Sequence, residues 1–341
     1  MGSTRILILG GGRQGRVVAA ALAGDFAVTV ADRVPVSVPR AACVVADLAD
    51  PAEVERAAAR FDLVIGALPA DIGFLAAKAT VAAGRPYVDI AFYEQDAAAL
   101  DADARRAGVC VLPDCGVAPG LSNLVAGRAA TVRQARGIHI KVGGVAADPR
   151  RPYGYVVTWS PDDLAAEYVR PARVRRGGKV VSLPATSELE LCEIPGLGRM
   201  EAFVTDGLRT LLSLDVPEMT EKTLRWPGHL AAVLPYVKDG SLRARLAHDC
   251  TEGDDVVAFR VDVDREAVTM VAAARAGVTA MARTTALTCA AFGRLVATGG
   301  VRDRGMVTPE QVGRDREAYR FVLETLASDG VVLTPGLPFL D

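Results

Sequence analysis

The sequence lacks the features that a membrane span, a disulfide framework or a zinc site requires. Its 341 residues contain no run of 18 apolar residues, and the first nine residues do not have the pattern of a signal peptide. No C-x-x-C pair occurs, and the three histidines have no metal-ligand spacing. The cysteines are scattered, as is typical of a reducing compartment: Cys43, Cys110, Cys115, Cys192, Cys250 and Cys289. We therefore expect a cytoplasmic protein that binds no metal.

The chain also lacks an excess of charge of either sign. The formal net charge is -2, which gives no electrostatic reason to expect binding to nucleic acid or to an anionic membrane. Apolar residues make up 50% of the chain and charged residues 23%, as in a globular protein. Because the chain is too long for one small core, we expect two domains.

A glycine-rich turn follows the first apolar run. Residues 6–9 lead directly into Gly10, Gly12 and Gly15, at the G-x-G-x-x-G spacing, and an alanine-rich segment, residues 17–22, follows. A strand, a tight turn and a helix start in this order are typical of a dinucleotide-binding site, because the glycines let the backbone approach a pyrophosphate at the helix N-terminus. The expected cofactor-binding residues of this turn are Gly10, Gly12, Arg13, Gln14 and Gly15.

An acidic residue follows the second predicted strand, residues 27–31. Asp32 comes 17 positions after Gly15, near the offset expected for the carboxylate that binds the ribose hydroxyls. A carboxylate here repels the 2′-phosphate of NADP, which favours NAD. Arg33 could instead pair with that phosphate, or lie over the adenine, so NADP stays an alternative.

Strands and helices alternate regularly up to residue 130, which predicts a doubly wound parallel sheet, the Rossmann fold. The further expected strands are residues 42–45, 62–68, 86–91 and 109–113. The expected helices are residues 50–60, 72–83, 94–107 and 121–130. Because ligands bind at the carboxyl ends of parallel strands, the expected cofactor contacts include Asp47, Leu48, Ala67, Leu68 and Pro69.

The pattern changes between residues 136 and 283. Strand-like stretches occur at residues 137–145, 154–159, 179–183 and 256–263, and the last alternates apolar and charged residues as a half-buried strand does. We expect a second domain on a mixed or antiparallel sheet. A helix at residues 279–298 and a segment at 309–328 close the chain.

Two acidic residues mark the ends of predicted Rossmann strands. Asp89 lies within the apolar strand 86–91, and Asp114 follows strand 109–113. A carboxyl group is costly to bury unless it has a partner or a chemical task. Both residues are therefore candidates for chemistry at the carboxyl edge of the sheet.

At this point the sequence resembles the saccharopine reductase-like oxidoreductases, and within them the lysine 6-dehydrogenases most. The matching stretches are residues 10–15, 88–93, 114–123, 141–144, 159–161, 167–168, 205–210, 221–229 and 283–285. Saccharopine reductases proper usually have an acid before the proline of the G-x-x-P-G segment, where this chain has Ala118, and they are longer. Both departures favour a substrate smaller than saccharopine.

The resemblance implies a Rossmann domain formed by residues 1–120 and about 284–341, with an inserted α/β domain, residues 121–283, for substrate binding and dimerisation. It implies a homodimer or higher homo-oligomer that acts on a small amino acid. The implied reaction is NAD-dependent oxidative deamination of the side-chain amine of L-lysine to a semialdehyde, which cyclises to a piperideine carboxylate. An NADPH-dependent condensing reductase of the saccharopine or carboxynorspermidine type is the alternative, and a non-catalytic dinucleotide-binding sensor is a third hypothesis.

The matched stretches suggest roles for individual residues. Arg209 or Arg225 would bind the substrate carboxylate, although either could equally form a structural ion pair, and Trp159 would line the methylene chain. Gly144 and Thr210 are further expected substrate contacts. The candidates for proton handling are Asp89, Tyr93, Asp114 and His229. Cys115 is not expected to act as a nucleophile, because the reaction needs no covalent intermediate.

Overall fold

The computed structural model describes residues 4–251 and 253–340 and divides the chain into two compact units. The first unit holds the chain up to Leu124 together with Thr285–Asp329. The second holds Val125–Thr284 and the residues from Gly330 onward. Within the described residues, no helix combines the length and apolar content that crossing a membrane requires.

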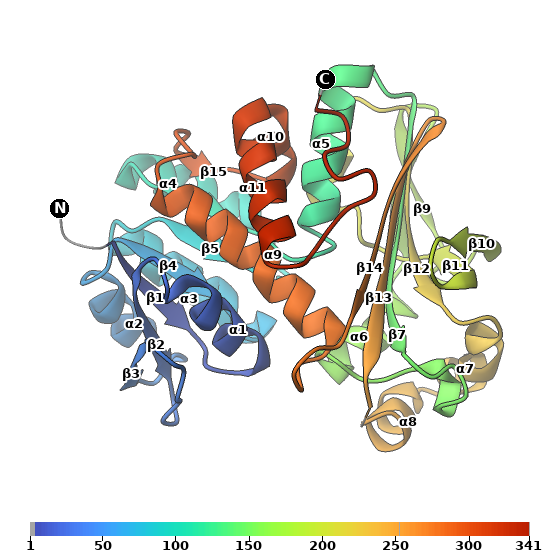
Figure 1. Ribbon diagram of the computed structural model, residues 1–341, viewed down its shortest axis with the longest axis horizontal. Coiled ribbons are helices and arrows are strands. Elements are labelled where there is room, and N and C mark those ends of the chain that lie inside the picture. The colour runs from blue at the N-terminus through green and yellow to red at the C-terminus, as the bar shows by residue number, and fades with distance from the viewer. Residues whose placement is uncertain (1–3, 252, 341) are drawn as a thin grey trace. The chain divides into compact units, whose positions relative to one another are not determined.

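The first unit is built on a parallel sheet with the strand order β15-β6-β5-β4-β1-β2-β3 (Figure 1). The strands are β1 (Arg5–Leu9), β2 (Ala27–Asp32), β3 (Ala42–Val45), β4 (Leu63–Gly66), β5 (Tyr87–Asp89), β6 (Cys110–Leu112) and β15 (Gly305–Met306). The chain builds β1, β2 and β3 outward and then crosses to β4 on the other side of β1. This reversal puts the topological switch point, where open α/β sheets bind their ligands, at the carboxyl ends of β1 and β4, and the predicted Rossmann sheet is confirmed.

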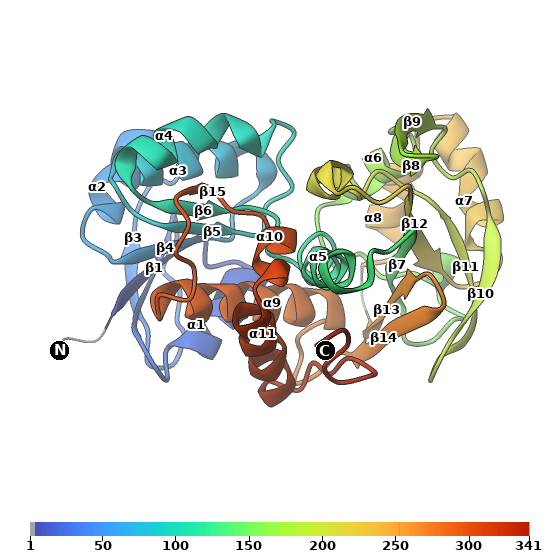
Figure 2. The same ribbon diagram turned by 90° about the horizontal axis from the view of Figure 1, so that it is seen from above.

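Helices cover both faces of this sheet. Figure 2 shows α2, α3 and α4 on one face and α1 and α9 on the other. The helices that lie wholly or partly in this unit are α1 (Arg13–Leu22), α2 (Pro51–Ala58), α3 (Ala70–Ala82), α4 (Asp101–Ala107), α5 (Leu121–Arg133), α9 (Ala280–Ala297), α10 (Pro309–Arg314) and α11 (Arg316–Ser328). The unit boundaries fall inside α5 and α9. Because β1 is buried from both sides, it reads as an uninterrupted apolar run in the sequence.

The second unit is built on a mixed sheet with the order β10-β11-β12-β7-β13-β14, and this prediction is also confirmed. The strands β12 and β7 are parallel, and their other pairings along this path are antiparallel. The strands are β7 (Gly137–Ala146), β8 (Ala172–Arg176), β9 (Lys179–Leu183), β10 (Glu190–Ile194), β11 (Gly198–Val204), β12 (Glu218–Arg225), β13 (Asp255–Val263) and β14 (Glu266–Ala273). The hairpin of β8 and β9 attaches to β12.

Three helices pack an apolar layer on one face of the second sheet. They are α6 (Pro161–Glu167), α7 (His229–Lys238) and α8 (Leu242–Asp249). Leu164, Leu230 and Leu246 of these helices join Phe203 of β11 in one buried cluster. The polar residues described below therefore lie between a sheet and helices, where water is largely excluded.

Two predicted elements are wrong. Residues 154–159 form no strand: a 3-10 turn, Pro152–Gly154, comes first, and the indole of Trp226 packs so closely on Gly154 that a side chain there would collide with it. Residues 94–107 form no single helix either. A 3-10 turn, Ala97–Leu100, precedes α4, and Asp96 caps this turn by accepting from the Ala98 N–H at 2.9 Å.

Candidate functional site

The glycine turn has the geometry that close approach of a dinucleotide needs. Gly10 has a φ of +99°, and a side chain there would lie 2.5 Å from the carbonyl oxygen of Ala67. A side chain on Gly15 would overlap the Gly10 carbonyl, so α1 must pack directly on the turn. Gly12 has no neighbour within 4 Å of its Cβ position and opens outward. Gly10 and Gly15 are therefore required for packing, and the open position at Gly12 leaves room for a phosphate.

The N-terminus of α1 is free to bind an anion. Gly12 is the N-cap, no side chain of the described residues caps the helix, and its first turn contains no acid. Arg13 is exposed and Gln14 is half-buried. Backbone N–H groups in this position, aided by the helix dipole, suit a pyrophosphate.

Asp32 is fixed beside this turn by two backbone contacts. Its Oδ2 accepts a hydrogen bond from the Gly11 N–H at 2.7 Å, and its Oδ1 accepts from the Val34 N–H at 3.1 Å. The neighbouring Arg33 is exposed. A carboxylate at the end of β2 is suited to ribose hydroxyls. The residues of the first unit therefore fit a dinucleotide.

The other predicted cofactor residues fall into two groups. Ala67, Leu68 and Pro69 follow β4, and the Ala67 N–H donates to the Leu9 carbonyl at 2.8 Å, which ties this segment to the end of β1. Asp47 is exposed after β3, whereas Leu48 is 7% exposed and belongs to the core. The structure brings the first group to the glycine turn, and it places Leu48 in a packing role.

A buried carboxyl lies at the end of β5. Asp89 is fully buried and accepts hydrogen bonds from the Ala91 N–H at 2.6 Å and from the Tyr93 hydroxyl. Burial raises the pKa of Asp89 to about 6, and the hydroxyls of Tyr87 and Tyr93 offset part of that rise. Gly66 at the end of β4 has no room for a side chain beside this carboxyl. Asp89 thus lies directly against the carboxyl end of β4, next to the switch point of the sheet.

Asp114 comes from the adjacent strand. It is 1% exposed and has a φ of +59°. The next residue, Cys115, donates its N–H to the Asp89 carbonyl at 2.7 Å, which joins the two strand ends. Burial raises the pKa of the Cys115 thiol well above its usual range, so this sulfur stays protonated. The structure therefore brings Asp89, Tyr93 and Asp114 to neighbouring positions.

The second unit contains a buried arginine among aromatic rings. Arg225 is 3% exposed and lies 4.8 Å from the centre of the Tyr155 ring. Its Nε donates to the Tyr168 hydroxyl at 3.2 Å, and its Nη1 donates to the Leu224 carbonyl at 2.9 Å. Its Nη2 lies 3.8 Å from Oε2 of Glu167. Two nitrogens of the guanidinium, Nε and Nη1, are thus hydrogen-bonded to protein groups, and the third, Nη2, faces the Glu167 carboxyl.

His229 belongs to the same cluster. Its Nδ1 lies 2.7 Å from the Tyr153 carbonyl, which can only accept, so Nδ1 carries the proton. Its Nε2 then accepts from the Tyr168 hydroxyl at 2.7 Å. Burial, and after it the charge of Arg225, lowers the pKa of His229 to about 3. A neutral ring with both nitrogens engaged is suited to holding Tyr168 and Arg225 in place.

Sequence reasoning missed two acids of this cluster. Glu221 is 5% exposed, and its Oε2 accepts from the Thr205 hydroxyl at 2.6 Å. Burial raises the pKa of Glu221 to about 8 and that of Glu167 to about 7. Glu221, Thr223 and Arg225 alternate as residues on one face of a strand do, but this spacing does not show that the face is buried.

The remaining predicted substrate residues are spread over the second unit. Trp159 packs, half-buried, in the aromatic cluster beside Tyr155 and Tyr168. Arg209 and Thr210 begin the 3-10 turn Arg209–Ser213. Gly144 lies in β7 against Met281. The structure thus brings Trp159, Arg225 and His229 into one cluster, and Gly144 packs on a different residue.

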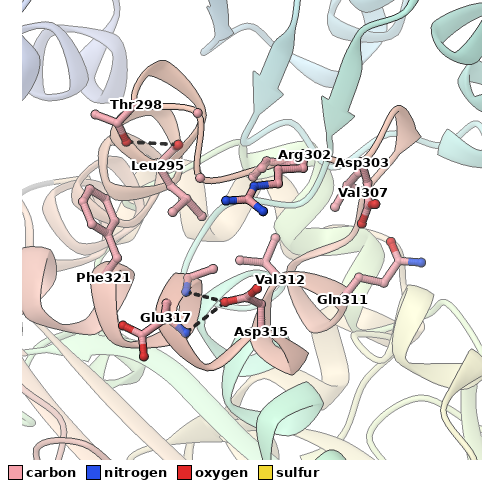
Figure 3. A pocket seen from close by; sticks show the side chains of 14 residues that line it. Leu295, Thr298, Arg302, Asp303, Val307, Gln311, Val312, Asp315, Glu317 and Phe321 are labelled. Carbon is pink, nitrogen blue, oxygen red and sulfur yellow. Dashed lines mark hydrogen bonds between the residues drawn. The ribbon is translucent and has the colours of Figure 1, made fainter.

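A surface cavity of about 650 Å³ lies elsewhere in the first unit (Figure 3). Its lining includes Leu295, Arg302, Val312, Asp315 and Phe321. Asp315 caps α11 by accepting from two backbone N–H groups, each at 2.9 Å. The cavity adjoins the β15 edge of the sheet, whereas the glycine turn belongs to β1. In the described ranges, no group of three or more His, Cys, Asp or Glu residues is placed to hold a metal ion.

The parallel sheet, the open glycine turn and Asp32 together define a dinucleotide-binding protein of the Rossmann class. The sequence profile of the saccharopine dehydrogenase NADP binding domain matches residues 6–112. The profile of the saccharopine dehydrogenase C-terminal domain matches residues 116–248 and 241–331. The chain therefore belongs to the saccharopine dehydrogenase family of NAD(P)-binding oxidoreductases, which confirms the resemblance seen in the sequence.

Individual relatives are distant. The chain is 26% identical to saccharopine dehydrogenase [NADP(+), L-glutamate-forming] of Schizosaccharomyces pombe over 160 residues, 45% of this chain and 36% of that protein. It is 26% identical to the mitochondrial alpha-aminoadipic semialdehyde synthase of Bos taurus over 197 residues, 52% of this chain and 21% of that protein. The matches thus span well under half of these relatives.

A solved structure shares the fold over nearly the whole chain. It is apo saccharopine dehydrogenase (L-Glu forming) from Saccharomyces cerevisiae, with a TM-score of 0.73 and 16% identity. The match covers 96% of this chain and 98% of that one. At this identity the likeness concerns the fold alone.

Proposed function

We propose that the protein catalyses NAD-dependent oxidation of the side-chain amine of L-lysine or a close analogue. The amine-bearing carbon loses a hydride and the nitrogen loses a proton, which leaves an imine. Water hydrolyses the imine to ammonia and a semialdehyde, which cyclises to a piperideine carboxylate. NAD, when bound, supplies the hydride acceptor, and the chain's own residues bind and orient the amino acid and hold its proton.

The preference for NAD rests on Asp32. Its carboxylate is anchored by the N–H groups of Gly11 and Val34, so it cannot easily turn away from a ribose bound at the turn. A 2′-phosphate at that place would face a fixed negative charge. Arg33 is the residue through which NADP could still be accepted, since its side chain is exposed beside Asp32.

The observation that carries the substrate proposal is the Arg225–Glu167 pair. A buried guanidinium with a carboxyl 3.8 Å away presents one positive and one negative group, the complement of an amino acid's own carboxylate and ammonium. Trp159 lies in the adjoining aromatic cluster and suits the methylene chain. Arg209 is the second proposed contact for the carboxylate.

We assign proton handling to Asp89 with Tyr93 and to Asp114. The Tyr93 hydroxyl donates to Asp89, and the pKa of that carboxyl, about 6, lets it exchange a proton near neutral pH. Asp114 is joined to the same strand end through Cys115. His229 contributes by positioning Tyr168, because both of its ring nitrogens are engaged.

The second candidate is an NADPH-dependent condensing reductase that joins an amine to an aldehyde. It is favoured by the relatives, one of which is named as an NADP-linked, glutamate-forming saccharopine dehydrogenase. The sequence departs from that type at Ala118, where saccharopine reductases usually have an acid.

We further propose a cytoplasmic homodimer or higher homo-oligomer that forms through the second unit. The apolar side chains of Val180, Leu189 and Leu191 on this unit are 52%, 55% and 58% exposed. A contiguous patch of exposed apolar side chains marks an association surface, and we propose that these three residues contribute to one. Light scattering after size-exclusion chromatography should give at least twice the 35.7 kDa chain mass, and a monomer would contradict this proposal.

The function is tested by supplying the purified protein with NAD and, in turn, lysine, ornithine, α-aminoadipate and simple diamines. Lysine-dependent NADH formation with release of ammonia is the expected result. Consumption of NADPH only when an amine and an aldehyde are supplied together would show the condensing reductase instead. Absence of turnover with every combination would leave a dinucleotide-binding sensor.

A further inference from the structure

The strand β12 presents a buried row of polar side chains to the helical layer. Glu221, Thr223 and Arg225 alternate along the strand and are 5%, 5% and 3% exposed. At the usual rise of a strand, the Cα atoms of Glu221 and Arg225 are about 13 Å apart. The row thus has an acid at one end and a guanidinium at the other.

The guanidinium end is partly satisfied by protein groups. Nε and Nη1 of Arg225 donate to Tyr168 and to the Leu224 carbonyl. Nη2 donates to no acceptor among the described residues, because Oε2 of Glu167 is 3.8 Å away, beyond hydrogen-bond distance. This end can therefore still bind a carboxylate at Nη2 and an ammonium at Glu167.

The acid end has no cation of its own. Glu221 forms no ion pair within the described part of the chain, and the one hydrogen bond to its carboxyl comes from the Thr205 hydroxyl. Thr205 in turn contacts the Thr223 hydroxyl at 2.8 Å. A Cβ on Gly207 would lie 2.6 Å from the Glu221 carboxyl carbon, so the glycine is needed to admit this side chain. A carboxyl buried with a single neutral donor is complementary to a cation.

We propose that β12 is a template for an α,ω-diamino acid. Arg225 and Glu167 bind the carboxylate and the α-ammonium, and Glu221 binds the terminal ammonium, with Thr205 and Thr223 beneath the chain between them. The inference rests on the proposed function for the amino-acid head group and adds the recognition of the second amine. Two acids against one arginine favour a cationic substrate such as lysine over a substrate with several carboxylates.

Equilibrium binding to the full-length protein tests the template without turnover. Titration calorimetry at about pH 8.5, where the lysine ammonium is charged, would compare L-lysine with L-norleucine, which lacks the terminal amine, and 6-aminohexanoate, which lacks the α-amine. Glu221→Gln should weaken lysine by about 10- to 100-fold, the range of a charge-assisted hydrogen bond, and leave norleucine unchanged. Glu167→Gln should weaken lysine and norleucine and spare 6-aminohexanoate.

Glu218→Gln is the matched control, because Glu218 lies on the same strand with its side chain 42% exposed, and it should change none of the three affinities. Glu221→Asp keeps the charge and should retain part of the preference for lysine over norleucine. It serves as the second test of the template should Glu221→Gln fold poorly. Equal weakening of lysine and norleucine by Glu221→Gln, or no binding of lysine by the unmodified protein, would overturn the template. If the unmodified protein forms NADH from lysine but Glu221→Gln keeps the same preference for lysine over norleucine, the template is overturned and the proposed oxidation stands. If lysine binding depends on Glu221 as expected but no NADH forms, the proposed oxidation is overturned and the template stands.

Discussion

Replacing Glu221 with Gln should make the second unit more stable than the unmodified protein at pH 8, with little difference at pH 4. Burial raises the pKa of Glu221 to about 8, above the ordinary 4.5 of the unfolded chain. As pH rises from 4.5 to about 8, Glu221 loses its proton in the unfolded state but keeps it in the folded state, so the free energy of unfolding falls. The unmodified protein therefore loses stability over this window, whereas Gln, which has no charge, does not.

The magnitude follows from the difference between the two pKa values. A gap of about 3.5 pKa units corresponds to roughly 5 kcal/mol at the alkaline end of the window, since one unit is about 1.4 kcal/mol. The substitution preserves the local hydrogen bond, because a Gln carbonyl oxygen can still accept from the Thr205 hydroxyl. The difference between the two proteins therefore isolates the ionisation of Glu221.

Urea unfolding followed by tryptophan fluorescence at a series of pH values is the suitable assay. The chain has two tryptophans, Trp159 and Trp226, and both lie in the second unit, so the signal reports on that unit. Glu218→Gln on the same strand serves as the control and should follow the unmodified protein. Parallel pH curves for Glu221→Gln and the unmodified protein would refute the reasoning.

The first unit yields three further predictions. Gly15→Ala should lower the melting temperature, because its Cβ would overlap the Gly10 carbonyl and the forced shift costs about 1–3 kcal/mol. Gly12→Ala should leave the melting temperature unchanged and weaken NAD binding, because its Cβ meets no neighbour. A lower melting temperature in calorimetry for Gly12→Ala than for Gly15→Ala would contradict the turn geometry. Asp32→Ala should raise the Kd for NAD about tenfold, a loss of about 1.4 kcal/mol, and change that for NADP little; equal changes in fluorescence titrations would argue against its role. Tyr93→Phe removes a hydrogen bond that lowers the pKa of Asp89, so the acid limb of the pH–rate profile should move above about pH 6. An acid limb that does not move would exclude Asp89 as the titrating group.

The first unit was readable from the sequence because its signals are local. The glycine spacing, the buried run of β1 and Asp32 after β2 each follow from a few neighbouring residues, and the parallel sheet follows from their alternation. The same reasoning failed for residues 154–159. An apolar, aromatic stretch there resembles a strand, but its first residue, Gly154, packs against Trp226, which lies far along the chain.

The polar cluster of the second unit could be predicted only in part. Glu221, Arg225 and His229 all lie in the matched stretch 221–229, but by residue type alone Glu221 reads as an ordinary surface acid. Its burial depends on the room that Gly207 leaves, which the spacing of charges in β12 does not show. Two-sided burial also removed the alternation of apolar and polar residues by which β12 would have been recognised as a strand.

Isotope transfer from specifically labelled lysine tests the central claim most directly. L-Lysine carrying deuterium on the ε-carbon, incubated with the protein and NAD, should yield deuterated NADH with ammonia released, and α-deuterated lysine should yield unlabelled NADH. Label arriving from the α-carbon, or no NADH from either substrate, would contradict oxidation of the side-chain amine.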